Sequence, residues 1–243
     1  MTVTPKKVAI LQSCYIPWKG FFDLVRRVDE FILYDDAQYT KRDWRNRNRI
    51  KTPNGPLWLT VPVETKGKYT DAIKDMRVSD PRWNQRHWRS IQASYSRAPF
   101  FGTYRAALEE LFLGCRSESL SDLNFRFISY FCDTLSIATT LKWSMDYSVS
   151  DRRTERLVGL CRQAGATEYL TGPAARAYID ASLFEAAGIT LKYMDYQGYP
   201  EYPQLHPPFD HYVSIIDLLV HVGPEALAHM LPLPGAPDTE PTP

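Results

Sequence analysis

The distribution of apolar and polar positions in the first part of the chain predicts a strand, a helix and a second strand. Residues 7–13 form an apolar run, a turn follows around residues 17–20, and residues 21–28 place apolar side chains three and four positions apart. A second apolar run covers residues 30–35 and is typical of a parallel neighbour of the first strand. The opening segment is therefore expected to be a β-α-β unit.

The segment from residue 40 to residue 63 predicts an antiparallel hairpin. Two extended arms flank Pro53-Asn54-Gly55, and an Asn-Gly pair tolerates the positive φ that a tight turn requires. We therefore expect a two-stranded antiparallel ribbon beside the parallel strands.

The spacing of apolar residues becomes helical in the middle of the chain and then alternates between strands and helices. Consecutive helices are expected at residues 83–96, 99–113 and 120–136. Later strands are expected at 140–146, 167–171 and 189–194, and later helices at 152–164, 173–186, 213–221 and 224–230. Gly165 and Gly188 lie where helix C-caps need a positive φ, which supports two helix-to-strand joints.

Together these elements predict an α/β fold with a mixed, largely parallel sheet, an antiparallel hairpin and a three-helix block. The 243 residues contain enough apolar material for one large domain or two small ones. We interpret residues 1–230 as a single domain with a helical insertion around residues 82–137. Residues 231–243 have too few apolar side chains to offset their ordering entropy, so a flexible C-terminal tail is expected there.

Charge and hydropathy exclude several classes of partner. The chain has 29 Lys and Arg against 28 Asp and Glu, a net charge of +1, so it lacks the basic excess of proteins that neutralise nucleic-acid phosphates. No apolar run reaches the roughly 18 residues of a membrane span, and the N-terminal apolar stretch is too short for a signal peptide. We therefore expect a cytoplasmic protein that neither binds nucleic acid nor inserts into a membrane.

If residues 40–51 form one strand, its charged residues lie on one face. That face would carry Lys41, Asp43, Arg45, Arg47, Arg49 and Lys51, and the other Trp44, Asn46, Asn48 and Ile50. Guanidinium groups match the oxygens of a diphosphate or carboxylate, so this face could clamp a nucleotide sugar or the phosphopantetheine of a carrier. The alternative is a solvated hairpin face. Asn46 and Asn48, where an ordinary ribbon would more often have aliphatic residues, favour the clamp.

Cys14 follows the first strand, at the edge where open α/β sheets bind their ligands. Its neighbours are Gln12, Tyr15 and Trp18. A thiolate there could accept an acyl group from a thioester or an acyl-adenylate. The more common role of a lone Cys is that of a small buried hydrophobe. The four cysteines are widely scattered, which indicates free thiols.

The best acid-base candidates are His206 and His211, which lie in a Pro-rich loop that runs into a helix. Asp217 on that helix could orient an imidazole. Asp35 and Asp36 end the second strand, close to Cys14 if the two strands pair in parallel, and could bind a substrate ammonium group or act as a base. The alternatives are surface polar residues for the histidines and a turn-forming pair for the aspartates.

Several motifs are absent from the sequence. There is no HExxH or HxxxH helix, no GxGxxG loop, no Walker loop and no GxSxG elbow, so neither a metal site nor a bound cofactor is expected. Aromatic residues make up 13% of the chain. They could form the walls of a sugar-binding cleft as well as a packed core.

Two segments, residues 8–63 and 209–225, resemble the first and last blocks of the WbqC-like protein family. The first combines a Gln, an aromatic-Pro-Trp turn, Gly-Phe-Phe, an acidic strand end, Lys-Arg and Asn-Arg-Asn. Ser13 and Cys14 depart from the family pattern, which commonly has Pro and then Asn or an aromatic residue there. Carried over by position, the resemblance points to Gln12, Tyr15, Pro17, Trp18, Gly20, Asp36, Gln38, Lys41, Arg42, Trp44, Asn46, Arg47, Asn48, His211, Ser214 and Asp217.

The resemblance implies a role in assembling bacterial surface polysaccharide such as O-antigen. Our first hypothesis is an acyl or aminoacyl transferase, with glycyl among the transferred groups, that forms an amide on an amino sugar or a related amine metabolite. The acceptor would be that amine or its nucleotide sugar, and an acyl or aminoacyl carrier protein could be a partner. His206 or His211 would be the base, Asp35 or Asp36 would hold the amine, and Arg45 or Arg47 would bind phosphate.

The second hypothesis is a non-catalytic binding or scaffold protein that presents a nucleotide sugar or an acyl carrier to another enzyme. Both hypotheses require that three segments converge on one pocket. These are the end of the first strand with Cys14, the hairpin arm with Arg45 and Arg47, and the loop with His206 and His211, which we call the late loop.

Overall fold

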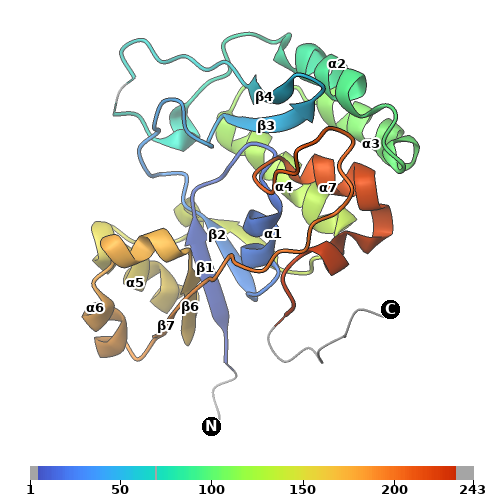
Figure 1. Ribbon diagram of the computed structural model, residues 1–243. Coiled ribbons are helices and arrows are strands. Elements are labelled where there is room, and N and C mark those ends of the chain that lie inside the picture. Colours follow the sequence, from blue (N-terminus) through green and yellow to red (C-terminus); the bar gives the residue numbers. More distant parts are fainter. Residues whose placement is uncertain (1–4, 69, 234–243) are drawn as a thin grey trace, which may run out of the picture.

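The computed structural model describes residues 5–68 and 70–233, and it confirms the α/β class (Figure 1). Within these residues one sheet has the strand order β5-β2-β1-β6-β7, and every neighbouring pair is parallel. Apolar runs form its centre because both faces are covered. The strands are β1 (Lys7–Leu11), β2 (Glu30–Leu33), β5 (Thr140–Trp143), β6 (Glu168–Thr171) and β7 (Thr190–Tyr193).

Helices cover both faces of this sheet (Figure 1). Because side chains alternate along a strand, Val8 and Ile10 pack on one face and Ala9 packs on the other. The first face is covered by α5 (Arg153–Gln163) and α6 (Ala181–Ala186). The second is covered by α1 (Lys19–Val25), α4 (Leu120–Thr134) and α7 (Ile215–Val222).

The predicted three-helix block is present. It consists of α2 (Trp83–Tyr95), α3 (Phe101–Leu113) and α4. Phe112 of α3 and Phe127 of α4 meet edge to face with ring centroids 4.9 Å apart, and Trp83 of α2 packs 6.2 Å from the same Phe127 ring. The block therefore shares one apolar core with the second face of the sheet.

The predicted hairpin is also present, as β3 (Arg47–Thr52) and β4 (Gly55–Thr60). Gly55 has φ +96°, which explains the Asn-Gly turn. The expectation of a strand over 40–51 is wrong at its start. Asp43 accepts hydrogen bonds from the Thr40 hydroxyl (2.6 Å) and the Trp44 N–H (2.6 Å), and these local bonds bend the chain before β3 begins.

Two helix expectations also need correction. The single helix expected over 173–186 is a 3-10 turn, Pro173–Ala177, followed by α6, because the Asp180 side chain accepts from the Ser182 N–H (3.0 Å) and caps a new helix. The helix expected over 224–230 is a 3-10 helix, Gly223–His229, and its first residue, Gly223, has a positive φ of +58°.

The start of the predicted C-terminal tail packs against the domain. Leu231 is buried, its N–H donates to Asp23 (3.2 Å), and the Arg27 guanidinium donates to the Pro232 carbonyl (2.6 Å). Residues 234–243 of that tail lie outside the described residues. In the part of the chain that the structure describes, every helix is too short or too polar to cross a bilayer.

Candidate functional site

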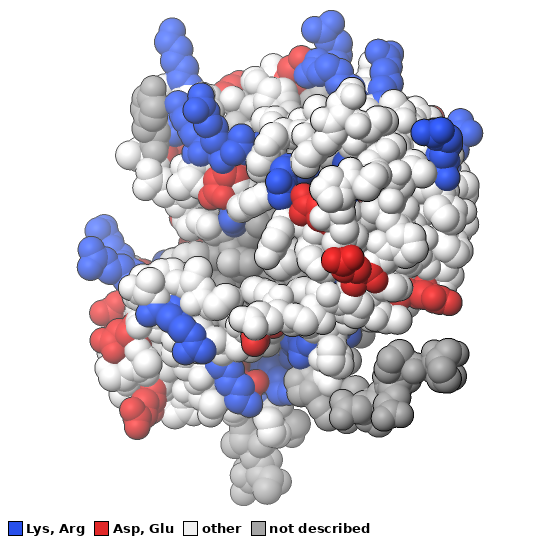
Figure 2. All heavy atoms as spheres, viewed as in Figure 1, with Lys and Arg blue, Asp and Glu red and all other residues white. Residues whose placement is uncertain are grey.

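A cavity of about 360 Å³ lies beyond the carboxyl end of β1, between the parallel sheet and the β3–β4 hairpin. Figure 2 shows the surface hollowed between these two parts of the molecule. This is the edge at which open α/β sheets bind ligands. We call it the first cavity, and its walls are Leu11, Cys14, Pro17, Trp18, Phe21, Trp44, Arg45, Asn48, Arg49, Tyr196 and Tyr212.

Three segments that are distant in the sequence meet in the first cavity, as the sequence predicted. Backbone pairing fixes them: the Tyr15 N–H donates to the Trp44 carbonyl (3.0 Å), and the Ser214 N–H donates to the Arg49 carbonyl (2.9 Å). The Asn48 side chain donates to the Ile16 carbonyl (2.8 Å) and ties the hairpin to the turn after β1. One cavity is therefore enclosed by the end of β1, the arm of the hairpin that carries Arg45 and Arg49, and the late loop.

Arg45 is a buried cation in this wall. Its Nη1 donates to the Gln12 carbonyl (3.0 Å), and its Nε lies 3.7 Å from a carboxylate oxygen of Asp43. The same Nε, and that of Arg49, have no hydrogen-bond acceptor among the described residues. Buried guanidinium N–H groups without an acceptor are costly, so both Nε groups would gain from an anionic acceptor.

Aromatic rings form the opposite wall of the first cavity. The Trp18 indole lies 5.3 Å from the Tyr196 ring and 5.4 Å from the Tyr212 ring, measured between centroids. A Cβ atom on Gly20 would lie 2.2 Å from this indole, so only glycine lets Trp18 lie across the start of α1. Such faces suit the apolar side of a sugar ring or a nucleobase.

Cys14 lies between the arginine and the aromatic walls. Its Sγ is 3.7 Å from the Gln12 carbonyl, and the residue is 8% exposed. Burial raises the pKa of the Cys14 thiol, and the nearby Arg45 only partly offsets that rise. The thiol is thus protonated at neutral pH until a base or a bound ligand changes its surroundings.

Two predicted residues support the cavity from behind and do not line it. Tyr15 is fully buried, and its hydroxyl lies 2.8 Å from Nδ1 of His87, whose Nε2 is 3.2 Å from the Thr60 carbonyl. Asn46 donates to the Val61 carbonyl (2.7 Å) and joins the start of β3 to the end of β4. Both residues position the loop after β1 and the hairpin.

The buried His87 predicts that the protein loses stability in acid. Burial lowers the pKa of His87 to about 4 from its ordinary 6.5. The unfolded chain therefore binds a proton between these values when the folded chain does not, and stability falls as the pH drops through that window. Between pH 7 and 4.5 we expect a loss of about 2 to 3 kcal/mol in the free energy of unfolding. Urea unfolding of wild type and His87→Gln measures it, and equal pH dependence in both would contradict it.

Asp35 and Asp36 follow β2, but their side chains bond to residues outside the first cavity. Asp35 is buried and accepts from the Ser13 N–H (2.8 Å) and the Ser121 hydroxyl (2.5 Å); burial raises the pKa of its carboxyl group. Asp36 pairs with Arg156 and accepts from the Ser144 hydroxyl (2.6 Å). Neither lines the first cavity.

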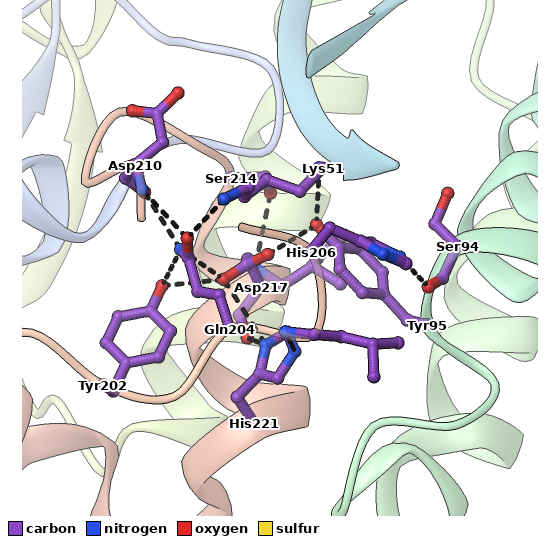
Figure 3. Close-up of polar contacts among 12 residues, drawn as sticks. Lys51, Ser94, Tyr95, Tyr202, Gln204, His206, Asp210, Ser214, Asp217 and His221 are labelled. Carbon is purple, nitrogen blue, oxygen red and sulfur yellow. Dashed lines mark hydrogen bonds and ion pairs between the residues drawn. The ribbon is translucent and has the colours of Figure 1, made fainter. Parts of the chain in front are cut away.

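Asp217 is the centre of a buried polar network beside the cavity (Figure 3). Its carboxylate accepts from the hydroxyls of Tyr95 (2.8 Å) and Tyr202 (2.9 Å) and from the side-chain amide of Gln204 (2.8 Å). Gln204 in turn contacts Asp210 and Lys51. The network therefore fastens the late loop to α7 and to the end of β3.

The two histidines of the late loop have different surroundings. His206 is buried, and its Nε2 lies 3.0 Å from the Ser94 carbonyl of α2. His211 is partly exposed and packs on Phe209 (4.5 Å) and Tyr199 (6.0 Å). Burial and the charge of Lys19 lower the pKa of His211, so its imidazole is neutral at pH 7. His211 thus lies next to the aromatic wall through Tyr199 and Tyr212.

The remaining predicted residues lie on the hairpin and its approach. Gln38, Lys41 and Arg42 are exposed, and Gln38 pairs with Ala72 through an isolated β-bridge. The Arg47 guanidinium lies 4.2 Å from the Trp58 ring centroid, and the exposed Trp44 packs against the same ring. The predicted single cationic face is wrong because the chain bends before β3 and because Arg45 and Lys51 are buried.

Sequence reasoning missed Tyr196 and Tyr212. Tyr196 follows β7, so it reaches the same sheet edge as Cys14, which follows β1. The rule that carboxyl ends of parallel strands share an edge could have found it. Across residues 5–68 and 70–233 no three His, Cys, Asp or Glu side chains gather as metal ligands would.

Comparison with known proteins gives one family and one close relative. The model of the WbqC-like protein family matches residues 12–229. The uncharacterized protein Rv1507c of Mycobacterium tuberculosis is 49% identical over 221 residues, which cover 91% of this chain and 96% of that protein. No solved structure matches significantly. The family match contains every wall residue of the first cavity except Leu11.

Proposed function

Because the chain belongs to the WbqC-like protein family, we propose that it is an acyl or aminoacyl transferase, with glycyl among the groups it transfers. It forms an amide on the amine of a nucleotide-activated amino sugar or a related metabolite, in the synthesis of surface polysaccharide or a secondary metabolite. The single observation that carries this proposal is that one cavity contains a thiol, two incompletely paired guanidinium groups and an aromatic wall.

The first cavity suits the nucleotide-sugar acceptor. Arg45 and Arg49 offer N–H donors to the diphosphate oxygens. Trp18 and Tyr212 offer flat faces for the sugar ring or the base. The volume of about 360 Å³ lies at the small end of the range for ligand sites, so part of a nucleotide sugar extends toward solvent.

Cys14 carries the acyl group in this proposal. The Cys14 sulfur attacks the carbonyl carbon of the donor thioester; a new S–C bond forms, the donor C–S bond breaks, and the thiol proton leaves with the donor thiol. The acceptor amine then attacks the same carbon, the N–C bond forms, and the Cys14 S–C bond breaks. The amine proton passes to a base and then to the Cys14 sulfur.

His211 is a better candidate for that base than His206. Its neutral imidazole has a buried Nδ1 without a hydrogen-bond acceptor or donor among the described residues, whereas Nε2 of His206 is within hydrogen-bond distance of a backbone carbonyl. His211 precedes Tyr212, which lines the first cavity. In this proposal the loop before α7 carries the imidazole to the amine when the acceptor binds.

One observation favours a second candidate, a non-catalytic binding protein for the nucleotide sugar or an acyl carrier. The raised pKa of Cys14 and the absence of a histidine from the described lining of the first cavity leave the thiol unactivated before a ligand binds. His211→Ala separates the two: lost turnover with unchanged affinity supports the enzyme, and unchanged pathway output supports the binding protein.

Intact-mass spectrometry tests the covalent step. Incubation with a glycyl or acetyl thioester of N-acetylcysteamine is expected to add one acyl group to wild-type protein and none to Cys14→Ala. Cys115 is similarly buried but lies in the loop after α3 and does not line the first cavity, so Cys115→Ala should still be acylated. No adduct on wild type, together with full activity of Cys14→Ala, would reject the thioester intermediate.

A further inference from the structure

A second cavity, of about 480 Å³, lies on the other side of β1 from the first. Val8 and Ile10 point toward this side, which α5 covers, and Gln12 continues the alternation beyond the strand end. Leu11 lines both cavities. The polar and aromatic walls of the second cavity are Gln12, Tyr34, Arg153, Thr154, Tyr169 and Tyr178.

The strand order explains why a second site lies there. Neighbours of β1 are β2 on one side and β6 on the other, so the order along the chain reverses between β1 and β6. The connections on either side of such a point run over opposite faces of the sheet and leave a crevice at its carboxyl edge. Gln12 follows β1, Tyr169 belongs to β6, and Arg153 begins α5, so the second cavity occupies this crevice.

Gln12 joins the two cavities. Gln12 lines the second cavity, and its backbone carbonyl accepts from Arg45 (3.0 Å) and from the Cys14 thiol (3.7 Å), which both line the first. Ligands in the two cavities would therefore approach each other at the end of β1. This is the arrangement that a transfer reaction between two substrates requires.

The walls of the second cavity suit a flat heteroaromatic ring that carries an anionic group. Tyr34 and Tyr178 line the cavity, and Tyr178 is 69% exposed, so it is free to cover such a ring, whereas Tyr169 is buried against Phe184 and forms the floor. The Gln12 amide offers one acceptor and two donors to a base edge. Arg153 is exposed and can pair with a phosphate.

We propose that the second cavity binds the adenosine phosphate part of the acyl donor, either an acyl-adenylate or a coenzyme A thioester. The assignment of donor and acceptor rests on the proposed function, whereas adenosine binding itself does not. The acceptor then occupies the first cavity, and the acyl group crosses the end of β1 to Cys14.

The two cavities contain a matched pair of exposed tyrosines for the test. Tyr178 lines the second cavity and Tyr212, 61% exposed, lines the first. Isothermal titration of wild type, Tyr178→Ala and Tyr212→Ala uses AMP, coenzyme A and uridine diphosphate glucosamine as probes. Tyr178→Ala should weaken AMP and coenzyme A by about 10-fold and leave uridine diphosphate glucosamine unchanged. Tyr212→Ala should do the reverse.

The outcomes separate this inference from the proposed function. Coenzyme A binding much more tightly than AMP identifies the thioester as donor, and equal or tighter AMP binding identifies the adenylate. If neither adenosine probe binds, or if Tyr178→Ala weakens the uridine nucleotide instead, the inference is overturned. If only uridine diphosphate glucosamine fails to bind, the proposed acceptor site is contradicted, and the inference about the second cavity is unaffected. Thermal unfolding of both variants verifies that they are folded.

Discussion

Replacing Asp217 with Ala is expected to lower the free energy of unfolding by about 3 to 5 kcal/mol, because it removes the acceptor from the centre of a fully buried network. The Tyr95 and Tyr202 hydroxyls and the Gln204 amide would lose the oxygens to which they donate. Buried donors without an acceptor retain their full desolvation cost. Urea unfolding, followed by tryptophan fluorescence, measures the loss.

Two further variants define the origin of that loss. Asp217→Asn keeps the size of the side chain and one acceptor oxygen, so about 1 to 2 kcal/mol is expected. Asp210, in the loop before α7, is partly exposed and lies 3.6 Å from Arg49, and its removal should cost under about 1 kcal/mol. A loss below 1 kcal/mol in Asp217→Ala would mean that the network does not hold the late loop.

The network also affects the first cavity. The late loop brings Tyr212 to Trp18 at 5.4 Å, and the Arg49 guanidinium donates to the Tyr212 carbonyl (2.9 Å). Asp217, which the sequence suggested as an imidazole partner, lies 3.4 Å from Nδ1 of His221, and through its other partners it anchors this wall of the cavity. Its hydroxyl and amide partners are contributed by α2 and the loop before α7, and not by the catalytic candidates.

Much of the framework was predictable because it depends on local pattern. The apolar run at Val8–Leu11 and the one at 31–33 pair in register as neighbouring parallel strands, and Asn54-Gly55 forms the expected turn. Ser214 caps α7 by accepting from the Ile216 N–H (3.3 Å), as residues of its type do before an apolar helix. Periodicity and turn chemistry suffice for such features.

The environment of each charged side chain was not predictable, because distant segments determine it. Asp35 looked like an exposed strand end, yet Ser121 of α4 donates to it from 86 residues away. Lys51 looked like part of a cationic surface, yet Gln204 and the Pro208 carbonyl bury its ammonium group. No pattern within either segment encodes these contacts. The anion-binding role of Arg45 stays a prediction, and its burial follows from the bend at Asp43.

Arg45→Ala is expected to weaken binding of uridine diphosphate glucosamine by about 30-fold or more, because removing one partner of a desolvated ion pair costs about 2 to 5 kcal/mol. Arg45 is 7% exposed, and its Nε has no hydrogen-bond acceptor among the residues described. A diphosphate oxygen would supply that acceptor. Arg45→Lys keeps the charge but not the planar fork, so an intermediate loss is expected. Isothermal titration measures the three dissociation constants.

Thermal unfolding of the same three proteins provides the control, because Arg45 also donates to the Gln12 carbonyl (3.0 Å). Arg86 lies on α2, is exposed and pairs with Asp80. It is the matched control, and Arg86→Ala should bind uridine diphosphate glucosamine like wild type.

The claim that the first cavity is the substrate site is tested most directly by this titration. We predict that affinity falls in the order wild type, Arg45→Lys, Arg45→Ala while all three remain folded. Equal affinity in the three folded proteins would contradict it.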